Sequence, residues 1–304
     1  MLAPIIVFSY NRPEHLQKTL EALSHNDLAA QSVLYIYCDG AKADASDEQI
    51  RRVKQNRELA HAAEGFLQVH VVEREKNYGL ADNIIGAVTE VVNKYGRVIT
   101  LEDDVITSVG FLKYMNEALD QYETDDQVMH VSGYMYPHKI KLPETFFYEV
   151  PYPGGGWATW QRAWNHFSND IDHLFDYWSP RWKEFNRFGG DYLQKQLQGN
   201  KDGSMYTWFI KWHAVVLMRG GLSLYPGVSL TNNIGFDSSG SNCGTMSQFD
   251  ILSPADYITV KRKRIIENRR AAKIIYHFYS GHWYSKRHRI LWMNKIKHLL
   301  RLEK

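Results

Sequence analysis

Three carboxylates stand in a row at Glu102, Asp103 and Asp104, directly after a short apolar run that ends at Leu101. Neighbouring carboxylates repel one another, and burying one is costly unless it is paired or binds a cation. Mg²⁺ or Mn²⁺ resolves that cost, because such an ion takes one or two protein carboxylates together with substrate phosphates. Side chains alternate along a strand, so Asp103 points away from the other two and not all three can bind one ion. The pattern predicts a metal and phosphate site, with a solvated acidic turn as the alternative.

The residues before this cluster repeat a pattern of strand, loop and helix. β-branched and aromatic runs predict strands, and helix-period stretches between them predict helices. Strands are expected at about residues 3–10, 33–37, 66–72 and 97–101, and helices at about 14–23, 46–63 and 79–95. Such repeats form a mostly parallel sheet flanked by helices, so the predicted fold class is α/β and Rossmann-like.

Polar residues follow three of the predicted strands at the point where each strand ends. Asn11 and Arg12 follow the first strand, Asp39 follows the second, and the acidic cluster follows the fourth. In parallel sheets, ligands bind beyond the carboxyl ends of the strands, where the loops converge. We therefore expect these residues to line one site.

Six segments, taken in order, carry a resemblance to a known family. They are Pro4 to Pro13, Asn77 to Asn83, Leu101 to Asp104, Gly155 to Trp160, Gly221 to Pro226 and Asn233 to Asp237. Over most of residues 3–245 the chain resembles glycosyltransferases of the GT-A fold. The resemblance is to bacterial relatives of N-acetylglucosaminyltransferase I and to the broad family of inverting sugar transferases in particular. Each segment is weak alone, but six in order at plausible spacing form a strong signal.

The resemblance implies a nucleotide-sugar donor, a sugar acceptor and a divalent metal, Mn²⁺ or Mg²⁺. UDP is the nucleotide that it favours, with GDP and dTDP as alternatives. It makes Asp104 the direct metal ligand, while Glu102 and Asp103 would contact ribose, sugar or metal-bound water. The resemblance assigns the nucleoside pocket to Ser9, Asn11, Arg12, Asp39, Lys76, Asn77 and Asp82.

The chain departs from the family pattern at the expected catalytic base. Phe209 lies in a Thr-Trp-Phe stretch that often reads Ser-Trp-Asp in relatives, so it stands where some of them carry an acid. The nearest acidic substitutes are Asp202 and Asp237, and both are candidate bases. Asp202 precedes a glycine and Asp237 lies in a Ser- and Gly-rich stretch, so a structural role in a turn or loop fits each residue too.

A second departure concerns the metal. Relatives commonly have a His two residues after the Gly of the loop that follows Asp237, and that position here is Asn242. If the His is a second ligand in those relatives, this protein binds its ion more weakly, or through Asn242, His282 or water.

A Gly-rich loop followed by tryptophans suggests an aromatic surface for a sugar. The glycines at 154–156 allow a ligand to approach the backbone closely, and Trp157 follows them directly. Sugar rings present apolar C–H faces on which flat aromatic rings stack, so we expect Trp157 to line the donor-sugar or acceptor pocket. Trp160 and Trp164 are four residues apart on an expected helix and fit a core position better.

The charge is divided unevenly along the chain. The segment from Lys261 to Lys304 holds 14 Lys and Arg but only two acidic residues, whereas the net charge of the whole chain is +2. Residues 1–258 are predicted to form one GT-A domain, with a nucleotide-sugar half at 1–125 and an acceptor half at 126–258. Residues 259–304 are predicted to form a basic amphipathic helical tail, which suits an anionic membrane surface. Docking on the acidic body of the chain and nucleic-acid binding are the alternatives, and nucleic acid is the less expected.

The composition bounds the function classes. With 44% hydrophobic and 23% charged residues the chain has a globular composition, and its two cysteines fit a reducing cytosol better than a disulfide scaffold. The first residues resemble a strand rather than a signal peptide, so we expect a cytoplasmic protein that is peripheral on the inner face of the cytoplasmic membrane.

Together these features predict an inverting hexosyl- or N-acetylhexosaminyltransferase that acts on a glycan or lipid-linked glycan in bacterial surface polysaccharide synthesis. A nucleotidyltransferase is the rival enzyme, although no early Gly-rich triphosphate loop is present. A binding protein that retains the fold without turnover is the rival non-enzyme. A G-x-S-x-G elbow and a G-x-G-x-x-G after the first strand are both absent, which disfavours serine hydrolases and NAD(P) enzymes.

Overall fold

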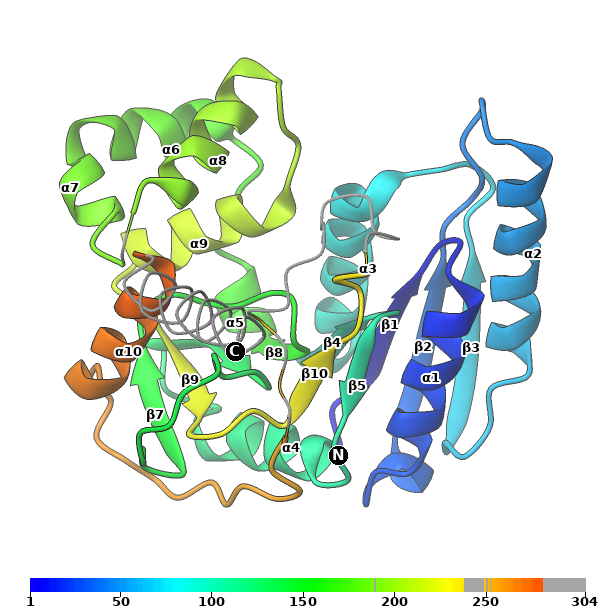
Figure 1. The fold of residues 1–304 in the computed structure, drawn as a ribbon, viewed down its shortest axis with the longest axis horizontal. Helices are drawn as coiled ribbons and strands as arrows, with labels where there is room; N and C mark the ends of the chain where they lie inside the picture. The colour runs from blue at the N-terminus through cyan, green and yellow to red at the C-terminus, as the bar shows by residue number, and fades with distance from the viewer. Residues whose placement is uncertain (189, 238–248, 250, 252, 281–304) are drawn as a thin grey trace, which may run out of the picture.

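The structure is a computed structural model that describes residues 1–188, 190–237, 249, 251 and 253–280. Its described part is built on an eight-stranded sheet with helices packed on both faces (Figure 1). The neighbouring pairs β3–β2, β2–β1, β1–β4 and β6–β9 are parallel, and β8 and β7 run antiparallel to their neighbours. The sheet is therefore mixed but mostly parallel, which confirms the predicted α/β fold class.

The strands follow the order β3-β2-β1-β4-β8-β6-β9-β7 across the sheet. In that order their bounds are Gln68–Glu73, Val33–Cys38, Ile5–Ser9, Arg97–Glu102, Trp157–Trp160, Val128–Ser132, Leu222–Pro226 and Thr145–Tyr148. A separate two-stranded ribbon pairs β5 (Val105–Thr107) with β10 (Thr231–Asn233).

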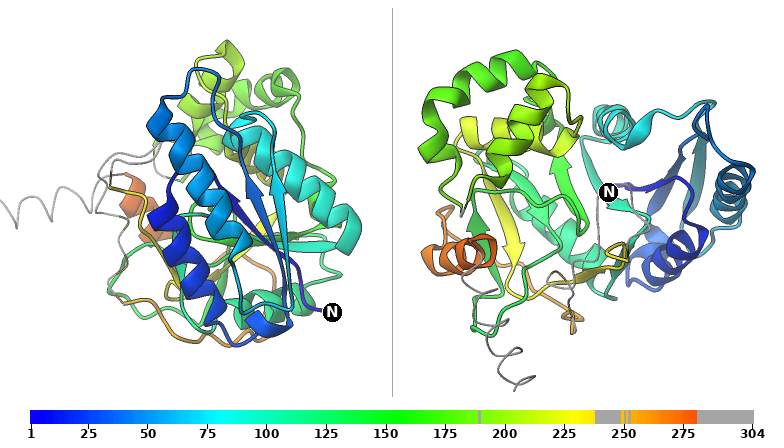
Figure 2. Two further views of the ribbon diagram at one scale, coloured as in Figure 1. Left: turned by 90° about the vertical axis from the view of Figure 1, so that its right-hand side faces the viewer. Right: turned by 45° about the horizontal axis from the view of Figure 1, so that its top comes forward.

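The helices of the first half are α1 (Pro13–Ser24), α2 (Asp47–His61), α3 (Gly79–Tyr95) and α4 (Phe111–Gln121). The second half contains α5 (Gln161–Trp164), α6 (Ile171–Trp178), α7 (Trp182–Phe185), α8 (Tyr192–Asp202) and α9 (Trp208–Met218), followed by α10 (Arg269–Tyr279). Short 3₁₀ turns lie at Ala29–Gln31 and Ser179–Arg181. Helices α6 to α9 gather into a lobe beside the sheet, on the side of the molecule away from α1 and α2 (Figures 1 and 2).

The alternation of side chains along β1 divides the core into two parts. Ile5 and Val7 pack with α1 and α4 on one face, whereas Ile6 and Phe8 pack with α3 on the other face. All four side chains are at most 4% exposed. Because β1 is buried on both faces, its position in the middle of the sheet fixes where Asn11 and Arg12 emerge.

The C-terminal segment differs from the predicted tail. A helix begins only at Arg269, and before it the chain runs along the body, where Arg262 makes two hydrogen bonds of 2.7 and 2.8 Å with the carboxylate of Asp125. Ile274 and Ile275 of α10 are buried against the core. Docking on the body of the same chain therefore describes residues 259–280 better than a free helical tail does, and residues 281–304 lie outside the described part. Among the described residues no helix is both long enough and apolar enough to cross a membrane.

Candidate active site

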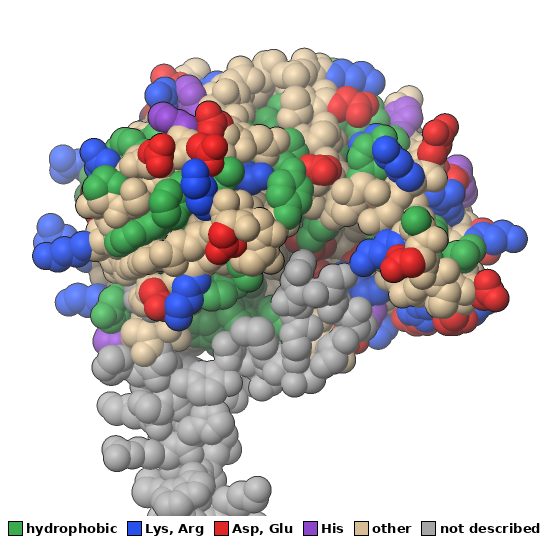
Figure 3. Space-filling view, turned by 90° about the horizontal axis from the view of Figure 1, so that it is seen from above, with side chains coloured by type: hydrophobic (Ala, Val, Ile, Leu, Met, Phe, Trp, Pro, Cys, Tyr) green, Lys and Arg blue, Asp and Glu red, His purple; other side chains and the backbone are tan. Residues whose placement is uncertain are grey.

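A cleft of about 330 Å³ opens where β1, β2 and β4 end and α3 begins. In the view from above, the surface is hollowed between the two halves of the molecule, and side chains of both charges surround the hollow (Figure 3). The cleft is lined by Phe8, Ser9, Tyr10, Asn11, Arg12, Asp39, Lys42, Asn77, Tyr78, Gly79, Leu80, Ala81, Asn83, Glu102, Asp103, Asp104, Tyr206 and Gly235.

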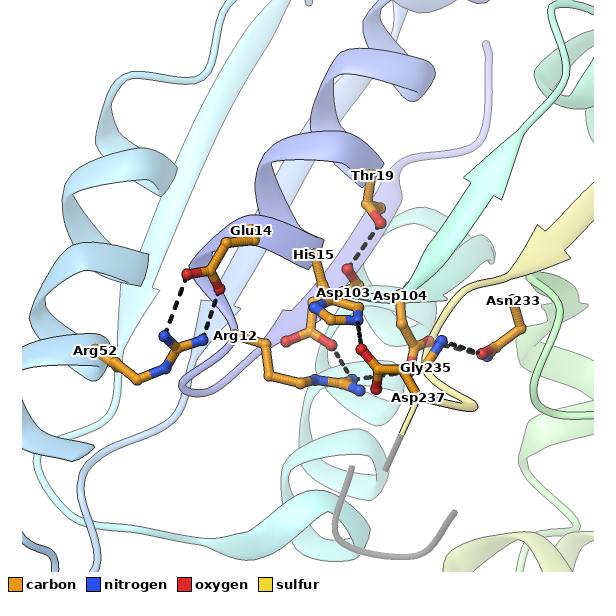
Figure 4. A network of polar contacts seen from close by, with 10 residues as sticks. All are labelled: Arg12, Glu14, His15, Thr19, Arg52, Asp103, Asp104, Asn233, Gly235 and Asp237. Atoms are coloured by element: carbon orange, nitrogen blue, oxygen red, sulfur yellow. Dashed lines mark hydrogen bonds and ion pairs between the residues drawn. The ribbon is translucent and has the colours of Figure 1, made fainter. Parts of the chain in front are cut away.

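Arg12 lies at the centre of the charged part of this cleft (Figure 4). Its Nη2 donates to Asp103 Oδ1 and, at 2.8 Å, to Asp104 Oδ2. Arg12 comes close to the two carboxylates because Phe8 of β1 pairs with Glu102 of β4 in parallel register. Both strands therefore end at the same edge of the sheet. The three side chains are only 15%, 5% and 9% exposed, so water screens these contacts weakly.

The ribbon of β5 and β10 holds Asp104 from the other side. Asn233 pairs with Val105 and donates from its side-chain nitrogen to Asp104 Oδ1 at 3.0 Å. Gly235 leaves room for this arrangement, since a Cβ on it would stand 2.1 Å from Asp104 Oδ2 and 3.0 Å from Arg12 Nη1. Both oxygens of Asp104 are thus placed by hydrogen bonds, and the carboxylate is oriented before any ligand arrives.

Burial shifts the proton affinities of the acidic cluster. Burial, and next the charge of Asp104, raise the pKa of Glu102 to about 8. Burial also raises the pKa of Asp103 to about 6, against the opposing effect of the Arg12 charge. Burial alone would lower the pKa of Arg12, but the charges of Asp103 and Asp104 outweigh it and raise that pKa. The cluster therefore carries more negative charge than Arg12 neutralises, which favours a further cation.

Asp39 organises the opposite wall of the cleft. Its Oδ1 accepts from the backbone nitrogens of Gly40 and Tyr78 at 2.9 and 2.8 Å. Its Oδ2 accepts from the Gly79 nitrogen and the Asn77 side chain, both at 3.0 Å. A carboxylate offers about four lone-pair sites, and all four are in use. Asp39 therefore ties the end of β2 to the start of α3, and the direct contact with base or ribose expected from the sequence would require it to give up one of these bonds.

A comparison with protein families matches residues 5–190 to Glycosyl transferase family 2. This match covers more than half of the 304 residues. The chain belongs to glycosyl transferase family 2. Membership of this family implies a nucleotide-sugar donor and a sugar acceptor as substrates. Enzymes of glycosyl transferase family 2 typically use a divalent metal through an acidic motif.

Solved structures give more distant similarities. TarS of S. aureus is 16% identical over 48% of this chain and 25% of its own chain, with a TM-score of 0.32. The apo form of mouse xyloside xylosyltransferase 1 is 11% identical over 72% of this chain and 82% of its own, with a TM-score of 0.38. The match thus spans about a quarter of the TarS chain.

The donor set fits the metal that glycosyl transferase family 2 enzymes use. Carboxylate oxygens are the ligands that Mg²⁺ and Mn²⁺ prefer, and one or two suffice when the substrate's phosphates complete the shell. No group of three or more His, Cys, Asp or Glu suited to a metal occurs among the described residues, so the protein alone supplies few ligands. Arg12 would have to release Asp104 Oδ2 before that oxygen could bind an ion. Asn242, the alternative ligand, lies outside the described residues.

Most of the residues expected to bind the donor do come together. Those that line the cleft are Ser9, Asn11, Arg12, Asp39, Asn77, Glu102, Asp103 and Asp104. Lys76 does not line it, and its backbone lies close to Gly40, where a Cβ would stand 2.5 Å from the Lys76 carbonyl carbon. Asp82 reaches the wall indirectly, through a hydrogen bond from Tyr206.

Trp157 is not where its predicted role requires it. The side chain is 3% exposed and stacks in the core between His130 and Trp208, with ring centroids 5.3 and 5.0 Å away. Side chains alternate along a strand, and on β8 the pleat turns this ring away from the cleft. The expectation that it stacks on a sugar is therefore corrected, and Trp157 is a core residue.

The two candidate bases are placed differently. Asp202 is exposed at the end of α8, where its Oδ1 accepts from the Ser204 nitrogen at 2.9 Å, and it is not among the cleft-lining residues. Asp237 lies beside Arg12 and Gly235 (Figure 4), and its Oδ2 is 3.2 Å from His15 Nε2. The placement disfavours Asp202 and leaves Asp237 as the better-placed acid.

Several lining residues were missed by the sequence analysis. Tyr10, Lys42, Tyr78 and Asn83 lie within a few residues of predicted residues in the chain, so extending each motif would have found them. Tyr206 comes from a loop with no recognised motif. Only the packing of the helical lobe against α3 brings it to the cleft.

Proposed function

We propose that this enzyme transfers a hexosyl or N-acetylhexosaminyl group from a UDP-sugar to a hydroxyl of a glycan or lipid-linked glycan, with inversion and with Mn²⁺ or Mg²⁺. One observation carries the proposal: the ion-paired group of Arg12, Asp103 and Asp104 lies in the cleft at the strand ends, within the family match. The Arg12 guanidinium, together with a metal ion held by the carboxylates, would suit the two phosphates of a nucleoside diphosphate.

The chemistry follows from the placement of the residues. Arg12 binds a phosphate oxygen with its planar guanidinium, and Asp104 would hold the metal. A bound metal stabilises the negative charge that develops on the departing nucleoside diphosphate. The acceptor hydroxyl attacks the anomeric carbon from the opposite side and loses its proton to a carboxylate.

Asp237 is our proposal for that carboxylate. Its side chain is 48% exposed, so an acceptor can reach it, and His15 contacts one of its oxygens. Phe209, at the position where relatives often carry an acid, packs against the rings of Trp208 and His213 instead. Asp237→Asn should lower kcat without weakening nucleotide binding.

The basic C-terminal segment supports a proposal for where in the cell the reaction takes place. Lys261, Arg264, Arg269, Arg270 and Lys273 are exposed on the described part of this segment. Basic side chains of this kind attract anionic lipids. We propose that the enzyme works at the inner face of the cytoplasmic membrane on a lipid-linked acceptor of bacterial surface polysaccharide.

Calorimetric titration of the full chain with UDP, GDP and dTDP, each with and without Mn²⁺, tests the proposed donor class. UDP should bind most tightly, and Mn²⁺ should strengthen its binding. If GDP or dTDP binds and UDP does not, that nucleotide replaces UDP in the proposal. If no nucleoside diphosphate binds under any condition, the transferase proposal fails. Intact UDP binding without turnover of any UDP-sugar would instead favour a binding protein that has lost its chemistry, as the loss of the acid at Phe209 would permit.

A further inference from the structure

The loop between α8 and α9 presents one side chain to the donor cleft. Tyr206 is the cleft-lining residue that comes from this loop, and its side chain is 57% exposed. The loop is held firmly at both ends. The Met205 nitrogen donates to the Gly199 carbonyl at 2.9 Å, and the Thr207 nitrogen donates to Asn200 Oδ1 at 3.0 Å. The phenol is thus placed over the cleft by a rigid support.

Tyr206 joins the two halves of the enzyme across the cleft. Its hydroxyl donates to Asp82 Oδ1, in the first turn of α3, at 2.5 Å. This hydrogen bond, together with burial, raises the pKa of Tyr206 to about 12, so the hydroxyl stays a proton donor at neutral pH. The second carboxylate oxygen of Asp82 accepts no hydrogen bond from the described residues.

A cation covers one face of the Tyr206 ring. Lys211 Nζ lies 4.2 Å from the ring centroid and donates to Asn169 Oδ1 at 3.1 Å. Lys211 is only 3% exposed, so its position is fixed by packing. With the hydroxyl held by Asp82 and one face held by Lys211, the ring is restrained in orientation while much of its surface stays open to the cleft.

A restrained aromatic ring beside a carboxylate oxygen without a partner has the chemistry of a sugar site. The apolar C–H face of a sugar ring packs on an aromatic face, and sugar hydroxyls donate to a carboxylate. We propose that Tyr206 and Asp82 form the subsite that selects the donor sugar, and that the sugar is a neutral hexose or N-acetylhexosamine. A uronic acid would bring a second negative charge to Asp82 and would be rejected. This inference rests on the proposed function, because it assumes that the nucleotide occupies the same cleft.

The test compares the affinity for UDP-sugars with the affinity for UDP alone. UDP, UDP-glucose, UDP-galactose, UDP-N-acetylglucosamine and UDP-glucuronic acid are titrated by calorimetry, with Mn²⁺, into wild type, Asp82→Asn, Tyr206→Ala and Tyr206→Phe. For the best neutral sugar, we compare the affinity for the UDP-sugar with the affinity for UDP. This ratio should fall about tenfold in Asp82→Asn, which loses a hydrogen bond to a charged group. It should fall about tenfold in Tyr206→Ala too, which loses the stacked ring. Tyr206→Phe keeps the ring and should lose about threefold or less. Asp82→Asn should also bind UDP-glucuronic acid better than wild type does.

The chain offers a matched control on the same helix. Tyr37 donates to Glu90 Oε2 at 3.1 Å, and Glu90 belongs to α3 but does not line the cleft. Glu90→Gln removes the same kind of carboxylate and should leave every affinity ratio unchanged. If all UDP-sugars keep their wild-type ratios in Asp82→Asn and Tyr206→Ala, the subsite assignment is overturned while UDP binding still supports the proposed function. Failure of the wild type to bind UDP, GDP or dTDP would overturn both.

Discussion

At the residue scale, the position of Arg12 explains how three adjacent carboxylates can stand at the end of a buried strand. Removing a charge from water costs several kcal/mol unless a partner compensates it. Arg12 compensates Asp103 and Asp104, whereas no side chain in the described part of the chain donates a hydrogen bond to Glu102. The incomplete compensation is unfavourable for folding and favourable for binding a cation.

The raised pKa of Glu102 makes stability depend on pH. The folded protein keeps this proton up to about pH 8, whereas the unfolded chain releases it near pH 4.5. The folded state therefore binds more protons between these values, so the free energy of unfolding should decrease as the pH rises from 5 to 8. Glu102→Gln should flatten this slope and be more stable than wild type at pH 8 by up to about 4 kcal/mol.

Urea unfolding at several pH values in the presence of a chelator measures this slope. Glu75→Gln, at an exposed position outside the cleft, serves as the control and should keep the wild-type slope. A wild-type stability that increases between pH 5 and pH 8 would contradict the assigned burial of the cluster.

The missing side chain of Gly235 is required for the geometry of Asp104. A Cβ would stand 2.1 Å from Asp104 Oδ2, so Gly235→Ala must displace the carboxylate or Arg12. The Mn²⁺-dependent affinity for UDP should fall at least about tenfold, the equivalent of one lost hydrogen bond to a charged group. Gly86→Ala, where the nearest atom is 4.0 Å away, is the control and should bind UDP as wild type does. Equal binding by the two variants would show that Asp104 is not fixed as described.

At the element scale, Asp39 couples the end of β2 to the first turn of α3. Asp39→Asn replaces an oxygen acceptor by a donor and breaks the bonds to Asn77 and Gly79 or those to Gly40 and Tyr78. The variant should lose about 2–3 kcal/mol of stability.

Two measurements check this coupling. Thermal or urea unfolding gives the loss of stability, and hydrogen exchange should become faster at the amides of Tyr78 and Gly79. Asp44→Asn, exposed in the same loop, should change neither measurement. If the hydrogen-exchange rates of these two amides stay unchanged in Asp39→Asn, Asp39 is available to bind the ligand instead.

The sequence predicts the first half of the fold better than the second. Strands β1 to β4 alternate with helices α1 to α3, and each unit is marked by a local run of residues, so the β-loop-α pattern could be read directly. The sheet beyond β4 depends on pairings between distant segments: β8 inserts between β4 and β6, and β10 pairs with β5. Periodicity carries no information about such pairings. The strand Trp157–Trp160 was therefore not predicted, although the helix expected around Trp164 is present as Gln161–Trp164.

The same difference between local patterns and distant pairings explains which site residues could be predicted. Residues that follow strands of the parallel half, such as Arg12 and Asp104, could be placed together from the rule that ligands bind at the carboxyl ends of strands. Trp157 and Tyr206 could not be placed, because their positions depend on how the second half packs on α3. A motif with aromatic residues shows that a ring is available but not which face of the sheet receives it.

At the scale of the whole molecule, the described part of the basic C-terminal segment docks on the body of the chain with some of its side chains and exposes others. Arg262 bonds to the body, and α10 buries its apolar side while it exposes Arg269, Arg270 and Lys273. The exposed cations should bind anionic vesicles of phosphatidylglycerol and phosphatidylcholine, but not vesicles of phosphatidylcholine alone. Replacing these three cations with Gln should weaken the binding about a hundredfold, since each contributes about 1 kcal/mol near an anionic surface.

Co-sedimentation at low and high salt measures the vesicle binding, which should decrease as salt screens the charges. The control carries three Gln substitutions at the exposed Lys54, Lys113 and Lys183, which keeps the net charge equal. If both triple variants lose binding equally, the effect is one of net charge and the C-terminal segment is not a specific membrane surface.

In the proposed donor site, Asp104 and its neighbours bind the diphosphate of a nucleotide sugar through a metal ion. Calorimetric titration of UDP with Mn²⁺ into Asp104→Asn, compared with wild type and with the control Asp202→Asn, tests it most directly. We predict that Asp104→Asn loses at least about tenfold in affinity and no longer responds to Mn²⁺, whereas Asp202→Asn behaves as wild type. Mn²⁺-dependent UDP binding that survives unchanged in Asp104→Asn would contradict this assignment of the donor site.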